Sequence, residues 1–258
     1  MSKPLRHVDL LGMRLAHVRS EELLDHLFAS LRHGVGGWIV TANLDILRRH
    51  ELEPAAREAY EGADLRVADG MPLLWASALS GDPLPERVAG STLTSELAAR
   101  AAEEGRTLFL LGGAEGAALR ARRVLEARHP SLRIVGHAAP VVSLPPTFEE
   151  LAELEALVRE SSPDICLVAF GSPKQEYVCR HLRTAFPRTW LMGVGVTLSF
   201  LAGDTPRAPE WMQRTGLEWL HRMAQDPERL VRRYLVDDLP FAFRLFGHAL
   251  RARVTFKR

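Results

Sequence analysis

The chain has 258 residues, of which 47% are hydrophobic and 25% charged, a composition typical of a globular protein with a sizeable core. Its formal net charge of +1 argues against a strongly basic nucleic-acid-binding protein, so nucleic acid is not an expected partner. The 2 cysteines offer neither metal-ligand spacing nor a disulfide framework. No uncharged run approaches the ~20 residues that a membrane-spanning helix needs, so we expect a soluble or peripheral protein.

The first part of the chain predicts a hairpin, a helix and a strand. Residues 8–18 carry a glycine between two short apolar runs, as in a hairpin, and Ser20 is expected to cap the helix that follows. The apolar run 37–40 predicts a strand that delivers Thr41 and Asn43 at its carboxyl end. Thr41 and Asn43 either contact a ligand at this edge of the sheet or merely cap the next helix.

A carboxylate and an arginine follow the next predicted strand. The strand over 65–68 ends at Asp69, and a helix is expected over 71–79. Asp69 is therefore either the cap of that helix or a general base that faces a crevice. Arg87 stands in a glycine-flanked loop before a helix expected over 91–104, and is either a solvated charge or a phosphate clamp.

Two glycines end the strand predicted over 107–111, which invites a dinucleotide-binding interpretation of Gly112 and Gly113. The fingerprint G-x-G-x-x-G, however, requires glycine at the position of Leu111, and the acidic residue expected ~20 positions later is missing. An NAD-dependent oxidoreductase is therefore a disfavoured alternative, whereas a backbone cradle for another phosphate stays open.

A third strand-to-helix turn has the composition of a phosphate site. Gly171 ends an apolar strand, Ser172 is expected to cap the next helix, and Pro173 is expected to be its first residue. Lys174 and Gln175 then lie in the first helical turn, beside the positive end of the helix dipole. The alternative is an ordinary turn with solvated side chains.

The alternation of strands and helices predicts the fold class. From residue 38 to residue 194, strands alternate with helical segments of the right length, so we expect an α/β fold with a mostly parallel, Rossmann-like sheet and helices on both faces. A capping box at Thr147 and Glu150 opens one of these helices. The predicted strands are 37–40, 65–68, 107–111, 132–136, 165–170 and 190–194.

The pattern changes to helix alone after residue 207, so we divide the chain into an α/β catalytic core, 1–207, and a basic-aromatic helical appendage, 208–258. Pro209 is expected to open one helix that extends past Trp219, and Asp226-Pro227 to open another. Residues 207–258 hold 11 basic and 6 acidic residues, a balance of +5, against 22 and 26, or −4, in the remainder. The appendage thus suggests an anionic membrane surface as a partner; packing on its own sheet is the alternative.

Taken together, these segments resemble the WecG/TagA/CpsF glycosyltransferases, and they occur in the order seen in that family. The resemblance covers roughly residues 10–234, and the GSPKQE and AGD-RAP-WMQ-GLEWL-R segments are its most specific parts. The segments that carry it are TANLD (41–45), VADGMP (67–72), ERVAG (86–90), LLGG (110–113), GSPKQE (171–176), LAGD (201–204) and RAPEWM (207–212).

The resemblance implies a GT-E type fold and an inverting transferase that needs neither a metal nor another cofactor. Such enzymes move a sugar, often of the N-acetylmannosamine type, from a UDP donor to a polyprenyl-diphosphate-linked saccharide in cell-surface polysaccharide synthesis. They work in the cytoplasm, as peripheral proteins on the inner face of the bacterial plasma membrane. The sequence leaves a homo-oligomer open, and a non-catalytic nucleotide-binding module that docks on membranes is the second hypothesis.

Roles for individual residues follow from matching positions. Asp69 corresponds to the general base, and Arg222 is an arginine that the appendage brings to the site. One departure concerns Ser199, which stands where many relatives carry an acidic residue, and which supplies no charge. The expected substrate contacts are Thr41, Asn43, Arg87, Gly112, Gly113, Gly171, Lys174, Gln175, Ser199, Arg229 and Arg232.

Overall fold

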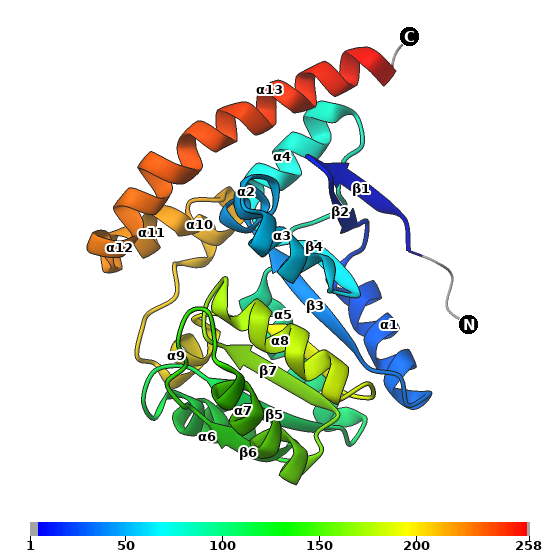
Figure 1. Ribbon diagram of the computed structural model, residues 1–258, viewed down its shortest axis with the longest axis vertical. Helices are drawn as coiled ribbons and strands as arrows, with labels where there is room; N and C mark the ends of the chain where they lie inside the picture. The colour runs from blue at the N-terminus through cyan, green and yellow to red at the C-terminus, as the bar shows by residue number, and fades with distance from the viewer. Residues whose placement is uncertain (1–4, 257–258) are drawn as a thin grey trace.

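The fold is built on one parallel sheet. The computed structural model describes residues 5–256, and for residues 229 and 254–256 it describes the backbone alone. Six strands lie in the order β4-β3-β8-β7-β5-β6, and all neighbouring strands are parallel (Figure 1), which confirms the predicted α/β class. The sheet strands are β3 (Gly37–Ala42), β4 (Leu65–Ala68), β5 (Thr107–Gly112), β6 (Arg133–Ala138), β7 (Ile165–Ala169) and β8 (Trp190–Gly193). The predicted hairpin is also present, as β1 (His7–Leu10) paired antiparallel with β2 (Met13–Ala16).

Helices cover both faces of the sheet, because successive strand residues point to opposite sides. In β3, Trp38 and Val40 belong to one apolar cluster and Ile39 to the other. The cluster of Ile39 is closed by α1 (Ser20–Arg32), α5 (Gly90–Glu103), α6 (Ala117–Arg128) and α9 (Thr197–Ala202). The cluster of Trp38 is closed by the hairpin and by α2 (Leu44–Leu52), α3 (Pro54–Glu61), α4 (Met71–Ser80), α7 (Phe148–Ser161), α8 (Lys174–Ala185) and α13 (Leu239–Phe256).

Two predicted helix caps were wrong by one residue. Helix α1 starts at Ser20 itself, because the Glu22 carboxylate accepts the backbone N–H of Arg19 at 2.8 Å and takes over the capping function. Helix α8 starts at Lys174, after Pro173, and the Ser172 hydroxyl lies 3.1 Å from the Tyr60 hydroxyl. In both cases, a partner that is not evident from the capping pattern determines where the helix begins.

The first helix predicted in the appendage is two helices. Chain direction changes between α10 (Glu210–Thr215) and α11 (Glu218–Gln225) at Gly216, whose φ is +78°. A Cβ atom at Gly216 would lie 2.6 Å from Cγ of Met71 in α4, so only glycine allows this approach to the body. Asp226 and Pro227 do open the next helix, α12 (Pro227–Val231), as expected.

The last helix is widened before its proline. A π-helical segment, η1 (Arg232–Asp238), joins α12 to α13, and Pro240 stands at the start of α13. Proline lacks an N–H and crowds the carbonyl four residues earlier, so a wider turn there lets the helix continue. Phe241, Leu245 and Ala249 then face the body and join its core, and α13 runs beside α4 (Figure 1).

A buried ionic clasp fixes η1 against α2. Asp45 accepts from Arg48 at 2.7 Å and pairs with Arg233 at 3.2 Å, and Arg48 also donates to Asp238 at 3.3 Å. Both carboxylates are nearly inaccessible to solvent. Burial raises the pKa of Asp238 to about 6; for Asp45, the effect of burial is outweighed by Arg233 and its neighbours, which lower the pKa. Two charged residues of the appendage, Arg233 and Asp238, thus form specific ion pairs with the body.

If α13 is part of the core, the two faces of this helix must differ in their effect on stability. Leu245→Ala, at a side chain that is 0% exposed, should lower the free energy of unfolding by about 2–5 kcal/mol. Leu250→Ala, five residues on and 51% exposed, is the matched control and should change it by less than about 0.5 kcal/mol. Urea unfolding measures both, and equal effects would mean that α13 is not packed on the body.

Candidate active site

The carboxyl ends of β3 and β4 bring three of the predicted residues together. The two strands are in register, with Thr41 opposite Val67, so Thr41, Asn43 and Asp69 all leave the sheet at one edge. A Cβ atom at Gly90 would lie 3.1 Å from Oγ1 of Thr41 and 3.6 Å from Oδ2 of Asp69. Asn43 caps α2, since its Oδ1 accepts from the N–H of Ile46 at 3.0 Å.

Asp69 does not cap the helix that follows it. Gly70 is the N-cap of α4, whereas Oδ2 of Asp69 accepts the backbone N–H of Gly90, the first residue of α5, at 2.9 Å. Burial raises the pKa of the Asp69 carboxyl, and this effect exceeds the opposite effects of the Gly90 N–H and the Arg87 charge. A carboxylate of increased basicity, held at a helix N-terminus, suits proton abstraction.

The appendage brings charged side chains to Asp69. Nη1 of Arg87 donates to Oε2 of Glu218 in α11 at 3.2 Å, and Arg222 follows one turn later in the same helix. Glu218 raises the pKa of Asp69, whereas Arg87 and Arg222 lower it, so all three charges act on this carboxyl. Arg207 reaches the other carboxylate oxygen of Glu218 at 3.6 Å. Arg87 is therefore one part of a larger ionic cluster, and its role as a phosphate clamp stays a prediction.

Of the other two arginines carried over from the resemblance, only Arg232 has a described side chain, and no described ion pair joins it to this cluster. Arg232 belongs to η1 and is exposed to solvent. Arg229 lies in α12, and its side chain falls outside the described residues.

A buried relay of polar groups lies next to Thr41. Gln175 is 5% exposed; its Oε1 accepts from the N–H of Gly195, and its Nε2 donates to Glu176, both at 3.0 Å. The Thr41 hydroxyl donates to the carbonyl of Gly193 at 3.4 Å, and a Cβ atom at Gly193 would lie 2.6 Å from Nε2 of Gln175. Gln175 is thus held in one orientation at the end of β8.

The side chain of Lys174 lies away from this relay. Its Nζ donates to the carbonyl of Val142 in the loop after β6, although Lys174 lies in the first turn of α8, as predicted.

The predicted glycines shape the far part of the same edge. Gly112 and Gly113 have φ of +93° and +91°, and a Cβ atom at Gly112 would lie 3.0 Å from the backbone of Ala169. The N–H of Gly113 donates to the Ala169 carbonyl at 2.8 Å, so these glycines give a close approach and not a nest of available N–H groups. A Cβ atom at Gly171 would meet open space.

Ser199 lies in the helix that packs against Gly113. It is buried in α9, next to Leu198, whose Cβ would be 3.6 Å from a Cβ atom at Gly113.

Sequence reasoning missed three charged residues of the site: Glu176, Arg207 and Glu218. All three occur within segments that carry the resemblance. The segments could have suggested them, but their partners come from distant parts of the chain. Oε2 of Glu176 is buried with no hydrogen-bond partner among the described residues, and burial raises its pKa to about 7.

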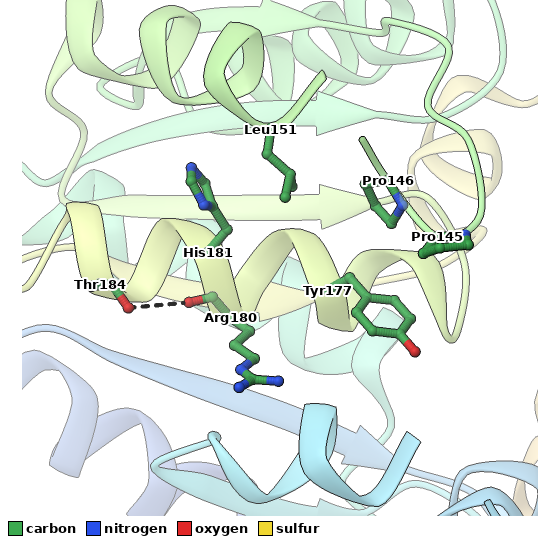
Figure 2. Close-up of a pocket in the computed structure, with 7 residues that line it drawn as sticks. All are labelled: Pro145, Pro146, Leu151, Tyr177, Arg180, His181 and Thr184. Carbon is green, nitrogen blue, oxygen red and sulfur yellow. Dashed lines mark hydrogen bonds between the residues drawn. The ribbon is translucent and has the colours of Figure 1, made fainter. Parts of the chain in front are cut away.

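A separate hollow of about 300 Å³ lies between α7 and α8 (Figure 2). Its side chains come from α8, from Leu151 in α7 and from two prolines of the preceding loop. The ionic groups there are already paired, His181 with Glu155 at 2.9 Å and Arg180 with Glu58 at 2.7 Å. We therefore place the candidate site at the sheet edge and not in this hollow.

The model of the WecG/TagA/CpsF glycosyltransferase family matches residues 8–255. Because the match spans almost the whole chain, the protein belongs to this family and is a glycosyltransferase of cell-surface polysaccharide synthesis. Within residues 5–256, no group of three or more histidine, cysteine, aspartate or glutamate side chains is arranged to hold a metal ion. Within the same range, no helix is long and apolar enough to cross a membrane.

The raised pKa of Glu176 has a testable consequence for stability. A carboxyl whose pKa is higher in the folded state than in the unfolded chain stabilises the fold below its ordinary pKa, and this contribution is lost as pH rises through the folded value. The change from 4.5 to about 7 corresponds to about 3 kcal/mol. Urea unfolding at pH 5 and pH 8 should therefore show a larger loss of stability in the wild type than in Glu176→Gln. Equal losses would show that Glu176 does not titrate in this range.

Proposed function

We propose that this member of the WecG/TagA/CpsF family moves a sugar, of the N-acetylmannosamine type or a related hexose, from a UDP donor to a polyprenyl-diphosphate-linked saccharide with inversion. The observation that carries the proposal is the surroundings of Asp69. Its carboxyl has a raised pKa, is held by the N-terminus of α5, and lies within the influence of two arginines. One base and a cationic partner for the leaving group are what a single displacement requires.

The chemical step then proceeds in one displacement. Asp69 takes the proton of the acceptor hydroxyl as that oxygen bonds to the anomeric carbon, and the bond from this carbon to the UDP oxygen breaks. Arg222, which the appendage places near Asp69, neutralises the negative charge that develops on UDP. Arginines can do this without a metal ion, so we propose a metal-independent transfer.

Donor contacts divide along the sheet edge. Thr41, Asn43 and Gln175 lie around the ends of β3 and β8, next to the base, and are proposed to contact the transferred sugar. The edge at the ends of β5 and β7, where Gly112 and Gly113 allow a close approach of the chain and Gly171 faces open space, is proposed for the nucleotide, together with Lys174. Ser199 offers a hydroxyl there, where an acidic residue would offer a charge.

The outer face of α13 supports docking on an anionic membrane, with the protein peripheral on the inner face of the plasma membrane. Leu239, Phe243 and Leu250 are exposed on this helix, while the opposite side is packed on the core. Exposed apolar side chains next to basic ones are typical of a helix that lies in the interface of a bilayer. Arg229 and Arg232 belong to the same basic segment of the appendage.

Asp69→Asn tests the proposed base. The amide keeps the shape and an oxygen that can accept from Gly90, but it cannot take a proton, so acceptor-dependent UDP release should fall roughly 100- to 10,000-fold, while UDP affinity by calorimetry changes little.

The assay contains excess EDTA and screens several UDP-sugars. Near-normal turnover in the variant would assign Asp69 a structural role, and activity that returns only with Mg²⁺ or Mn²⁺ would contradict the metal-independent step. A wild type that binds UDP but transfers nothing would favour the non-catalytic binding module.

Phe243→Glu tests the membrane surface. Phe243 is 70% exposed, so the substitution should preserve the fold while it weakens sedimentation with vesicles that contain anionic lipid, and weakens it further at high salt. Val35→Glu, at another exposed apolar residue in the loop before β3, is the control and should bind as the wild type does. Equal binding by all three proteins would exclude α13 as the docking surface.

A further inference from the structure

A cationic pocket lies beside Asp69, between the body and the appendage, and has a volume of about 490 Å³. Three arginines line it, each from a different segment: Arg87 from the loop before α5, Arg207 from the segment after α9, and Arg214 from α10. Its one acidic lining residue, Glu210, already pairs with Arg214 at 3.2 Å. The pocket therefore has an excess of positive charge at the position where body and appendage meet.

Arg207 is oriented in this pocket but incompletely bound. Its Nη2 donates to Oγ1 of Thr92 at 2.9 Å, and Thr92 lies in the first turn of α5, where the helix dipole favours an anion. Its buried Nε lies 3.6 Å from Oε1 of Glu218, too far for a hydrogen bond, and has no hydrogen-bond partner in the described part of the chain. A buried donor of this kind is costly unless a ligand satisfies it.

Glu218 holds two of the three arginines. Its two carboxylate oxygens lie 3.2 Å from Arg87 and 3.6 Å from Arg207. The Glu218 carboxylate thus lies between two guanidinium groups. A diphosphate has two acidic groups, so it can pair with both guanidinium groups more completely than one carboxylate does.

We propose that this pocket binds the diphosphate of the lipid-linked acceptor, and that Glu218 is the ionic partner that this diphosphate displaces from Arg87 and Arg207. The inference rests on the proposed function, because it takes the acceptor to be a prenyl-diphosphate-linked saccharide. It adds Arg207, Thr92 and Glu218 to the residues that determine acceptor binding.

Position and surface favour the acceptor over the donor as the source of the diphosphate. The glycines proposed for the donor nucleotide end β5 and β7, which β3 and β8 separate from β4 and Asp69 in the sheet. The pocket adjoins the Asp69 side through Arg87. Two exposed tryptophans stand near it, Trp75 one turn after the lining residue Met71 and Trp211 next to Glu210. A prenyl chain that leaves the diphosphate would meet this aromatic surface.

Binding of geranyl diphosphate to the full-length protein, measured by calorimetry with and without saturating UDP, tests the proposal. Arg207→Gln should weaken binding roughly tenfold or more, because hydrogen bonds to charged groups are lost. The affinity of Arg207→Lys should lie between that of Arg207→Gln and that of the wild type, because lysine keeps the charge but lacks the planar guanidinium group. Glu218→Gln should tighten binding, since the competing carboxylate is gone. A structural role would predict weaker binding for all three variants.

Arg106→Gln is the matched control. Arg106 is 25% exposed and pairs with Asp164 at 3.2 Å, and Arg207 is 26% exposed and pairs with Glu218; both have a buried Nε without a hydrogen-bond partner within the described residues. Arg106, however, lies at the amino end of β5, at the opposite edge of the sheet. Its substitution should leave geranyl diphosphate affinity unchanged, and circular dichroism verifies that every variant is folded.

Three results would overturn the proposal: wild-type protein that does not bind geranyl diphosphate, Arg207→Gln that binds it equally well, or UDP that competes with it. Competition would reassign the pocket to the donor diphosphate. Weaker binding of geranyl diphosphate by Glu218→Gln would show that the diphosphate does not displace Glu218 from Arg87 and Arg207. Sugar transfer is measured separately, so a protein that binds geranyl diphosphate as predicted but transfers no sugar contradicts the proposed function and leaves the diphosphate pocket in place.

Discussion

The clasp between α2 and η1 is the interaction on which the arrangement of the site depends. Asp45 and Asp238 are buried carboxylates, and each is paired with an arginine from the other element. Removing such charges from water is costly, and their attraction only roughly compensates for this cost, so the clasp contributes more to a unique arrangement than to net stability. Because α11 precedes η1 by one short helix, the arrangement fixed at Asp45 also limits where Glu218 and Arg222 can lie relative to Asp69.

The two carboxyls of the site, Asp69 and Glu176, differ in their partners, and their chemistry differs accordingly. Asp69 accepts one backbone N–H and experiences the charges of Arg87, Arg222 and Glu218, so it combines raised basicity with nearby cations. Glu176 has Gln175 as its side-chain donor at 3.0 Å and an oxygen without a hydrogen-bond partner among the described residues. Its pKa of about 7 keeps a large fraction neutral at physiological pH, which suits a group that orients Gln175 and does not take a proton from substrate.

Much of the fold could be predicted from sequence because its signals are local. The short apolar runs between helical segments gave all six sheet strands to within two residues, and Asn43 and Thr147 cap their helices as expected. The errors at Ser172 and Gly216 have one cause: a partner distant in sequence, Tyr60 in the first case and Met71 in the second. The residues that flank Ser172 or Gly216 in the sequence do not reveal this distant partner.

The candidate site was predictable only in part for the same reason. Thr41, Asn43 and Asp69 could be grouped because parallel strands end at a common edge, a rule that needs no knowledge of packing. Arg207 and Glu218 could not, since a charged residue in a helix or loop is usually solvated, and their significance arises from the contact of the appendage with the loop that carries Arg87. The incomplete bonding of Arg207 is visible only in three dimensions.

One face of α13 packs on the core, and its other face is proposed to dock on the membrane. The inner face, through Phe241 and Leu245, belongs to the core that also contains Leu73 of α4, and α4 begins directly after Asp69 and Gly70. The outer face carries the exposed apolar side chains proposed to meet the bilayer. A helix packed in this way cannot move on the membrane without disturbing the core against α4 or the clasp at η1. The proposed bilayer-facing surface and the proposed base are therefore connected by rigid packing, as a transferase requires if it takes one substrate from water and the other from lipid.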